Sequence, residues 1–137
     1  MDKSALVTPD HNRINCGDEL LHELSEANFP VHRALWRYSS EQYGDWRLVI
    51  ASKMVDELGP LAAYRKLDSI LREHRPDLVP WVRSVHLVSP KDSLIRDLDK
   101  TYPPQQMTSQ TLSILGSTAG STFIEEALLY SPHGTTE

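Results

Sequence analysis

The segment that most constrains the fold is 46–88, where a strand pattern, a helix and a second strand pattern follow one another. Residues 46–52 are apolar at positions facing both sides, which is typical of a strand inside a sheet. Gly59-Pro60 then opens a helix, because proline suits the first helical position, and residues 82–88 alternate again as a strand. Such a unit crosses over right-handedly, so we expect its two strands to be parallel.

The helix in this unit has a clear apolar stripe at helical spacing. We expect the stripe to consist of Leu61, Tyr64, Leu67, Ile70 and Leu71. On the N-terminal side, residues 31–38 read as a strand that pairs with 46–52 through a hairpin loop at 39–45. Because Arg33 and Arg37 alternate with Leu35, we expect this strand to be half exposed.

Two further helices are indicated by their start signals. The first is expected after Asp18 as its cap, with Leu20, Leu21, Leu24 and Ala27 on the inner face. The second is expected after Ser89-Pro90 with Ser89 as its cap and with Leu94, Ile95 and Leu98 facing inward.

The C-terminal segment supports two interpretations. Residues 111–115 resemble a strand, 116–121 a glycine-bearing turn, and 122–130 either a strand or a helix. Helix propensity favours the helix, whereas a short apolar run on each side of a turn favours a hairpin. We interpret residues 122–130 as a strand.

These elements predict an α+β fold: helix, β-hairpin, helix, strand, helix and terminal β-hairpin, with the helices packed on a mixed sheet. The length of 137 residues fits one domain. We expect a mobile leader at 1–15, a single α+β domain at 16–131 and a tail at 132–137.

Composition excludes several classes of protein. The net charge of −5 argues against a dedicated nucleic-acid binder. Cys16 is the single cysteine, so an intrachain disulfide and a cysteine-based metal cage are excluded. Without a signal-peptide core or an apolar run long enough to span a bilayer, we expect a cytoplasmic protein without membrane contact.

The chain contains no established catalytic or cofactor motif, and we predict no cofactor and no metal. The loop at 116–122 lacks the lysine of a phosphate-binding loop. Cys16 precedes the predicted first helix, where a helix N-terminus could lower its pKa, but we interpret it as incidental.

One enzymatic alternative stays open. A hairpin flanked by helices is also the setting of restriction-endonuclease-type metal sites, in which an acid on one strand and an acid-x-Lys on the next hold Mg²⁺. Here the candidates are Asp45, Glu41 and Lys53, and Ala51 stands where the pattern needs an acid. The alternative is therefore a small metal-dependent hydrolase or nuclease with a degenerate site.

Aromatic and arginine side chains gather around the first hairpin, as they do on interaction surfaces. The set comprises Arg33, Trp36, Arg37, Tyr38, Tyr43 and Trp46. In the competing interpretation Trp36 and Trp46 are core partners across two strands.

Several runs of the chain resemble small bacterial proteins without an assigned function. They are residues 34–38, 46–52, 55–57, 59–60, 63–65, 87–90 and 123–127. The resemblance implies a bacterial, cytoplasmic, single-domain protein with a strand-like final segment, and it transfers no catalytic residue. Together with the aromatic set, it leads us to expect a non-enzymatic interaction module that binds a protein partner or self-associates.

Overall fold

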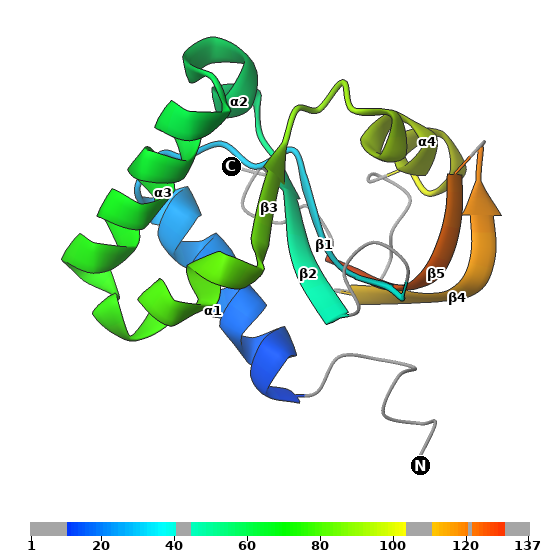
Figure 1. Ribbon diagram of the computed structural model, residues 1–137, viewed down its shortest axis with the longest axis horizontal. Helices are drawn as coiled ribbons and strands as arrows, with labels where there is room; N and C mark the ends of the chain where they lie inside the picture. The colour runs from blue at the N-terminus through cyan, green and yellow to red at the C-terminus, as the bar shows by residue number, and fades with distance from the viewer. Residues whose placement is uncertain (1–10, 41–44, 104–110, 121, 131–137) are drawn as a thin grey trace.

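The computed structural model describes residues 11–40, 45–103, 111–120 and 122–130. Five strands form one mixed sheet in the order β3-β2-β1-β5-β4, and helices cover both of its faces (Figure 1). This is the predicted α+β fold. The elements in chain order are α1 (His11–Glu26), β1 (Arg33–Ser39), β2 (Asp45–Ala51), α2 (Lys53–Leu58), α3 (Pro60–His74), the 3-10 helix η2 (Pro76–Ser84), β3 (Val85–Val88), α4 (Ser93–Thr101), β4 (Thr111–Ala119) and β5 (Thr122–Tyr130).

The strand–helix–strand unit has the predicted form. β2 and β3 are parallel, with Leu48 opposite Val85 and Ala51 opposite Val88, and α3 connects them. β2 is buried on both faces from residue 48 onward. The unit also contains the short helix α2, which was not predicted. Ser52 caps its start, because the Ser52 hydroxyl accepts a hydrogen bond from the Met54 N–H.

Two details of this unit differ from the prediction. Leu61 is 63% exposed, and Ala63 takes its place in the buried stripe of α3. Residues 82–84 belong to η2 rather than to β3. The reason is that Pro76 and Pro80 place a tight 3-10 helix between α3 and the strand.

The prediction of a half-exposed first strand was wrong. β1 is the central strand, paired antiparallel with β2 on one side and with β5 on the other. Arg33, Ala34, Leu35 and Trp36 are all buried, so both faces of its first half lie in the core. Pattern alone could not show this, because a buried arginine looks like a solvent-facing one in sequence.

The first helix starts earlier than predicted. α1 begins at His11, so Asp18 lies inside the helix and not at its cap. Residues 11–15, which were expected in a mobile leader, are therefore helical. The rest of that leader and the predicted tail at 132–137 lie outside the described residues.

Two hydrophobic cores lie on opposite faces of the sheet. α1, α3 and η2 cover one face, where Leu20, Leu67 and Leu78 pack against Trp36. α4 covers the other, with Leu94, Ile95 and Leu98 buried as predicted. Its cap is Asp92, whose carboxylate accepts from the Leu94 N–H, whereas Ser89 closes the preceding turn.

The terminal hairpin is confirmed, but its first strand is longer than expected and the hairpin is bent. β4 reaches Ala119, so the predicted turn residues 116–119 belong to the strand. At Gly116 the backbone has a φ of 55°, which favours glycine. Beyond this point both strands curl toward α4 (Figure 1), where the Asp97 carboxylate accepts a hydrogen bond from the Thr122 hydroxyl.

The bend changes which residues face inward. Ile114 and Ala119 are five positions apart on β4, and Ile124 and Ala127 are three apart on β5, yet all four pack in the same core with α4. In a regular strand, residues an odd number of positions apart lie on opposite faces. The hairpin therefore has no single alternation over its length.

Glu126, on β5, is a buried carboxyl group with an expected pH effect. It is 6% exposed, and its Oε1 atom has no hydrogen-bond partner among the described residues. Burial, and secondarily the charge of Glu125, raise its pKa above the ordinary value of 4.5. The folded state thus holds this proton more tightly than the unfolded state does. This tighter binding of the proton stabilises the folded state in full below pH 4.5, and the stabilisation is lost as the pH rises through the raised pKa of Glu126.

We expect Glu126→Gln to remove this part of the pH dependence. Urea unfolding between pH 4.5 and 7 should show a free energy of unfolding that falls with pH in the wild type and falls less in the variant. Glu57→Gln, at an exposed position of α2, is the control and should follow the wild type. Equal slopes for wild type and Glu126→Gln would contradict the assignment.

No helix among the described residues is long and apolar enough to cross a membrane.

Candidate functional site

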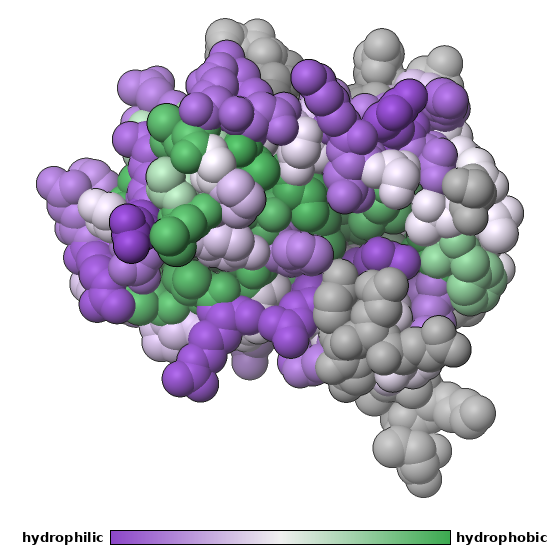
Figure 2. Space-filling view, turned by 45° about the horizontal axis from the view of Figure 1, so that its top comes forward, coloured by the Kyte–Doolittle hydropathy of each residue, from purple (hydrophilic) through white to green (hydrophobic). Residues whose placement is uncertain are grey.

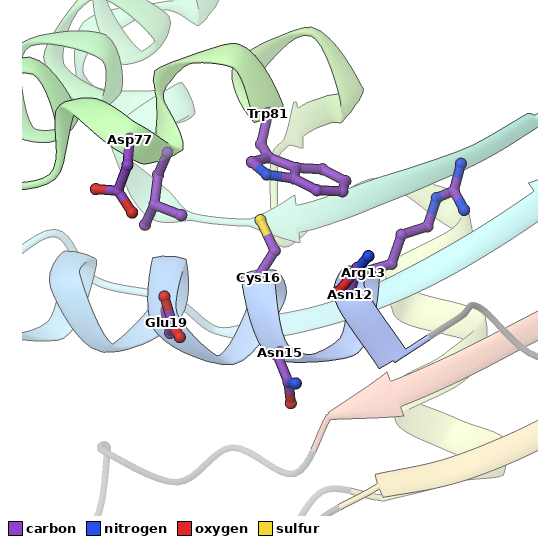
Figure 3. Close-up of a pocket in the computed structure, with 8 residues that line it drawn as sticks. Asn12, Arg13, Asn15, Cys16, Glu19, Asp77 and Trp81 are labelled. Carbon is purple, nitrogen blue, oxygen red and sulfur yellow. The ribbon is translucent and has the colours of Figure 1, made fainter.

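An open groove of about 560 Å³ runs between α1 and η2 (Figure 3). α1 contributes one wall and η2 the other. Its lining residues are Asn12, Arg13, Asn15, Cys16, Glu19, Asp77, Leu78 and Trp81. The groove combines an aromatic wall with a rim of amides and charges.

Cys16 lies at the floor of the groove, and its side chain points toward η2 (Figure 3). The residue is 6% exposed. Burial, with a smaller effect from the charge of Glu19, raises the pKa of the Cys16 thiol to about 12. It sits in the second turn of α1, away from the N-terminus that could have lowered the pKa. The thiol is therefore protonated at neutral pH and is a poor nucleophile.

The carboxylates at one end of the groove are occupied by an arginine. Arg75 donates to Glu19 at 2.6 Å and to Asp77 at 2.8 Å, so one guanidinium joins α1 to η2. These hydrogen bonds hold the pKa of Asp77 below its ordinary value. Because the groups are exposed, the bridge positions the two helices rather than adding much stability.

Trp81 forms the aromatic wall and connects the groove to the core. Its ring meets that of Trp36 edge-on, with centroids 6.3 Å apart and an interplanar angle of 75°. Trp36 in turn donates from Nε1 to the Tyr130 hydroxyl at 3.1 Å, and Tyr130 donates to the Ile14 carbonyl at 2.7 Å. Trp81 is half-buried, and its ring packs against Trp36, which this hydrogen-bonded set holds in the core.

The aromatic–arginine set predicted from the sequence does not form one exposed surface. Trp36 is fully buried and Trp46 is 5% exposed, with Tyr38 packed against Trp46 at a centroid distance of 5.6 Å. The two tryptophans are core residues, as the competing interpretation held, but they are not partners across the strands: Trp36 lies opposite Leu48 and Trp46 opposite Tyr38. Arg37 is half-buried and donates to the Phe123 carbonyl at 3.5 Å, and Tyr43 lies outside the described residues.

Arg33 is 2% exposed and serves the core instead of a surface. It donates to the Asp99 carboxylate at 3.2 Å and to the Tyr102 carbonyl at 2.5 Å. His32 reaches the same carboxylate at 2.7 Å. Burial lowers the pKa of Arg33, and the charge of Asp99 opposes that effect. This cluster ties the start of β1 to the end of α4.

The residues of the enzymatic alternative are not brought together. Asp45 begins β2 and Lys53 follows its end, so the strand separates them. Asp45 faces Arg13 at 3.5 Å, while Glu41 lies outside the described residues. Among the residues that the structure describes, no three histidine, cysteine, aspartate or glutamate side chains are grouped to hold a metal ion. Residues 116–119 of the predicted glycine loop belong to β4, and the next described element is the strand β5 rather than a helix.

Sequence reasoning missed Trp81 because the strand assigned to 82–88 obscured η2. The two prolines in Pro76–Ser84 were the available signal.

Compared with known proteins, the chain matches no protein-family model, no curated protein and no solved structure.

Proposed function

We propose that the protein is a non-enzymatic interaction module that receives a protein partner in the groove between α1 and η2. The observation that carries this proposal is Trp81, an aromatic side chain that packs against the buried Trp36 and lines the wall of an open groove. Tryptophan and arginine are enriched among the residues that dominate binding energy, and such residues are surrounded by a polar rim. Here the rim is made by Asn12, Arg13 and Glu19.

The chemistry of the groove favours binding over catalysis. Its thiol is held protonated, and the carboxylates of Glu19 and Asp77 already bind Arg75. A partner would offer an apolar or aromatic side chain to Trp81, with polar groups on either side for the rim. The predicted role as an interaction module is thus retained, but its surface moves from the hairpin to this groove.

The partner should be lost when Trp81 is truncated. We expect Trp81→Ala to weaken capture by at least about 30-fold, which corresponds to the 2 kcal/mol or more typical of a dominant interface residue. The measurement is an affinity capture from lysate, followed by titration of the captured protein against each variant. Leu61→Ala removes an equally apolar and more exposed side chain on α3 and should bind normally.

A variant of the groove rim distinguishes a direct loss of binding from a loss of folding in Trp81→Ala. Asn12 is exposed at the second position of α1, where glutamate is well tolerated by the helix dipole. Asn12→Glu should weaken binding without changing the melting temperature. Capture that is unaffected by both Trp81→Ala and Asn12→Glu, or that Leu61→Ala reduces as much, would overturn the proposal.

A further inference from the structure

The two edges of the sheet are protected very differently. β3 forms one edge and is only four residues long. The Tyr64 hydroxyl donates to the Val85 carbonyl at 3.3 Å and accepts from the Leu87 N–H at 2.9 Å. The Val88 carbonyl is engaged by Ser52 at the β2 side, and Tyr64 occupies two groups on the outer side of β3. This short edge therefore offers little backbone to a further strand.

β4 forms the other edge, and no side chain among the described residues is seen to engage its backbone at residues 112–119 as Tyr64 engages β3. It is nine residues long, and it contains no charged residue and no proline. Among the described residues, only β5 pairs with the backbone of residues 112–119. Proteins normally guard such an edge with lysine, proline, a bulge or a covering element, because its free N–H and C=O groups pair with other strands.

We infer that β4 pairs antiparallel with β4 of a second copy of this chain, joining two five-stranded sheets into one. Antiparallel pairing of identical strands satisfies a two-fold axis, in which the same surface serves both copies. The absence of charge in β4 matters here, because any charged side chain near the axis would face its own like charge.

The bend at Gly116 locates the contact. Its φ of 55° interrupts the extended backbone, and the strand beyond it curls over α4. Residues 111–115 form the straight half of β4. When the two-fold axis passes beside residue 113, at the centre of this half, the exposed Ser113 lies opposite Ser113 of the second copy. Leu112 then lies opposite Ile114 of the second copy. The contact thus joins hydroxyls at its centre and apolar side chains beside them.

A lysine at the axis tests the inference. We expect the wild type to dimerise with rising concentration in sedimentation equilibrium. Ser113→Lys should raise the dimer dissociation constant about fivefold, because like charges then face each other at the axis. Ser69→Lys makes the same change at an exposed position of α3 and should dimerise like the wild type.

A cysteine at the axis gives a positive signal that does not depend on weakening the contact. Directly opposite Cβ atoms on antiparallel strands lie close enough for a disulfide, and the buried Cys16 does not compete. With copper–phenanthroline as oxidant, Ser113→Cys should form a covalent dimer within the time in which Ser69→Cys remains monomeric.

Three results would overturn the inference: a wild type that is monomeric at every concentration, a Ser113→Lys variant that dimerises as strongly as the wild type, or equal cross-linking of the two cysteine variants. The inference does not rest on the groove. Ser113→Lys should still capture a partner that Trp81→Ala loses.

Discussion

In the native protein, Cys16 should react with Ellman's reagent at pH 8 at least about 50-fold more slowly than in the urea-unfolded chain. Raising the thiol pKa from 9.0 to about 12 lowers the thiolate fraction about 1000-fold at this pH. The more basic thiolate is intrinsically more nucleophilic, which offsets roughly 20-fold of that loss. Burial of the sulfur behind Trp81 and Leu78 slows the reaction further.

The measurement is the rate at which the reagent releases its coloured thiolate on reaction with Cys16, in buffer and in urea. The unfolded protein is the control, because its reaction counts all of the reduced thiol. A native rate within about tenfold of the unfolded rate would contradict the burial of Cys16. A partner seated in the groove should slow the native reaction again, so the same thiol reports on binding.

Gly17→Ala should lower the free energy of unfolding by about 3 kcal/mol. A Cβ at this position would overlap the Tyr130 hydroxyl and lie 2.9 Å from Trp36 Nε1. Both groups belong to well-packed buried side chains, and overpacking of this kind costs about 1–3 kcal/mol. Disturbing the hydrogen bonds between Trp36, Tyr130 and Ile14 adds about 1 kcal/mol each, whereas alanine returns about 1 kcal/mol of helix propensity.

A double variant identifies the cause. Tyr130→Phe removes the hydroxyl and should itself destabilise the protein, because Trp36 Nε1 loses its acceptor. With the hydroxyl gone, however, the closest contact of the alanine methyl is removed, and only the contacts with Tyr130 Cζ and Trp36 Nε1, both at 2.9 Å, remain. Urea unfolding of the double variant should therefore show less destabilisation than the sum of the two single changes. A neutral or stabilising Gly17→Ala would show that α1 does not pack this closely.

The elements that the sequence predicted well are those whose pattern is local. In the β2–α3–β3 unit, Gly59-Pro60 marks the helix start, and β3 lies parallel to β2 as expected of a strand–helix–strand unit. The inward face of α4 was also correct, since Leu94, Ile95 and Leu98 repeat at helical spacing over a short, regular helix.

The errors occurred where a distant residue decides the outcome. Arg33 looked solvent-facing, but Asp99 and the Tyr102 carbonyl, 66 and 69 positions away, satisfy it inside the core. β5 fitted neither a helix nor a strand cleanly because the bend at Gly116 changes which residues face inward between Ile124 and Ala127. A single two-residue alternation cannot describe a strand in which the inward-facing side changes partway along its length.

The candidate site lies elsewhere than the predicted aromatic–arginine set. Both tryptophans of that set, Trp36 and Trp46, are buried in the core. Trp81, which was not part of the set, lines the groove from an element that the pattern did not reveal. Because η2 is a 3-10 helix interrupted by prolines, its side chains follow neither the helical nor the strand period.

The contact between Tyr130 and Ile14 also bears on how the chain is made. It joins residues 116 positions apart, and β5 is the neighbour that completes the central strand β1. On the ribosome, α1 and β1 emerge early but cannot reach their final packing until the last strand has been synthesised. Non-local pairing of this kind slows folding and leaves apolar surface open meanwhile. The sheet of the nascent chain therefore stays incomplete at its centre until β5 has been made.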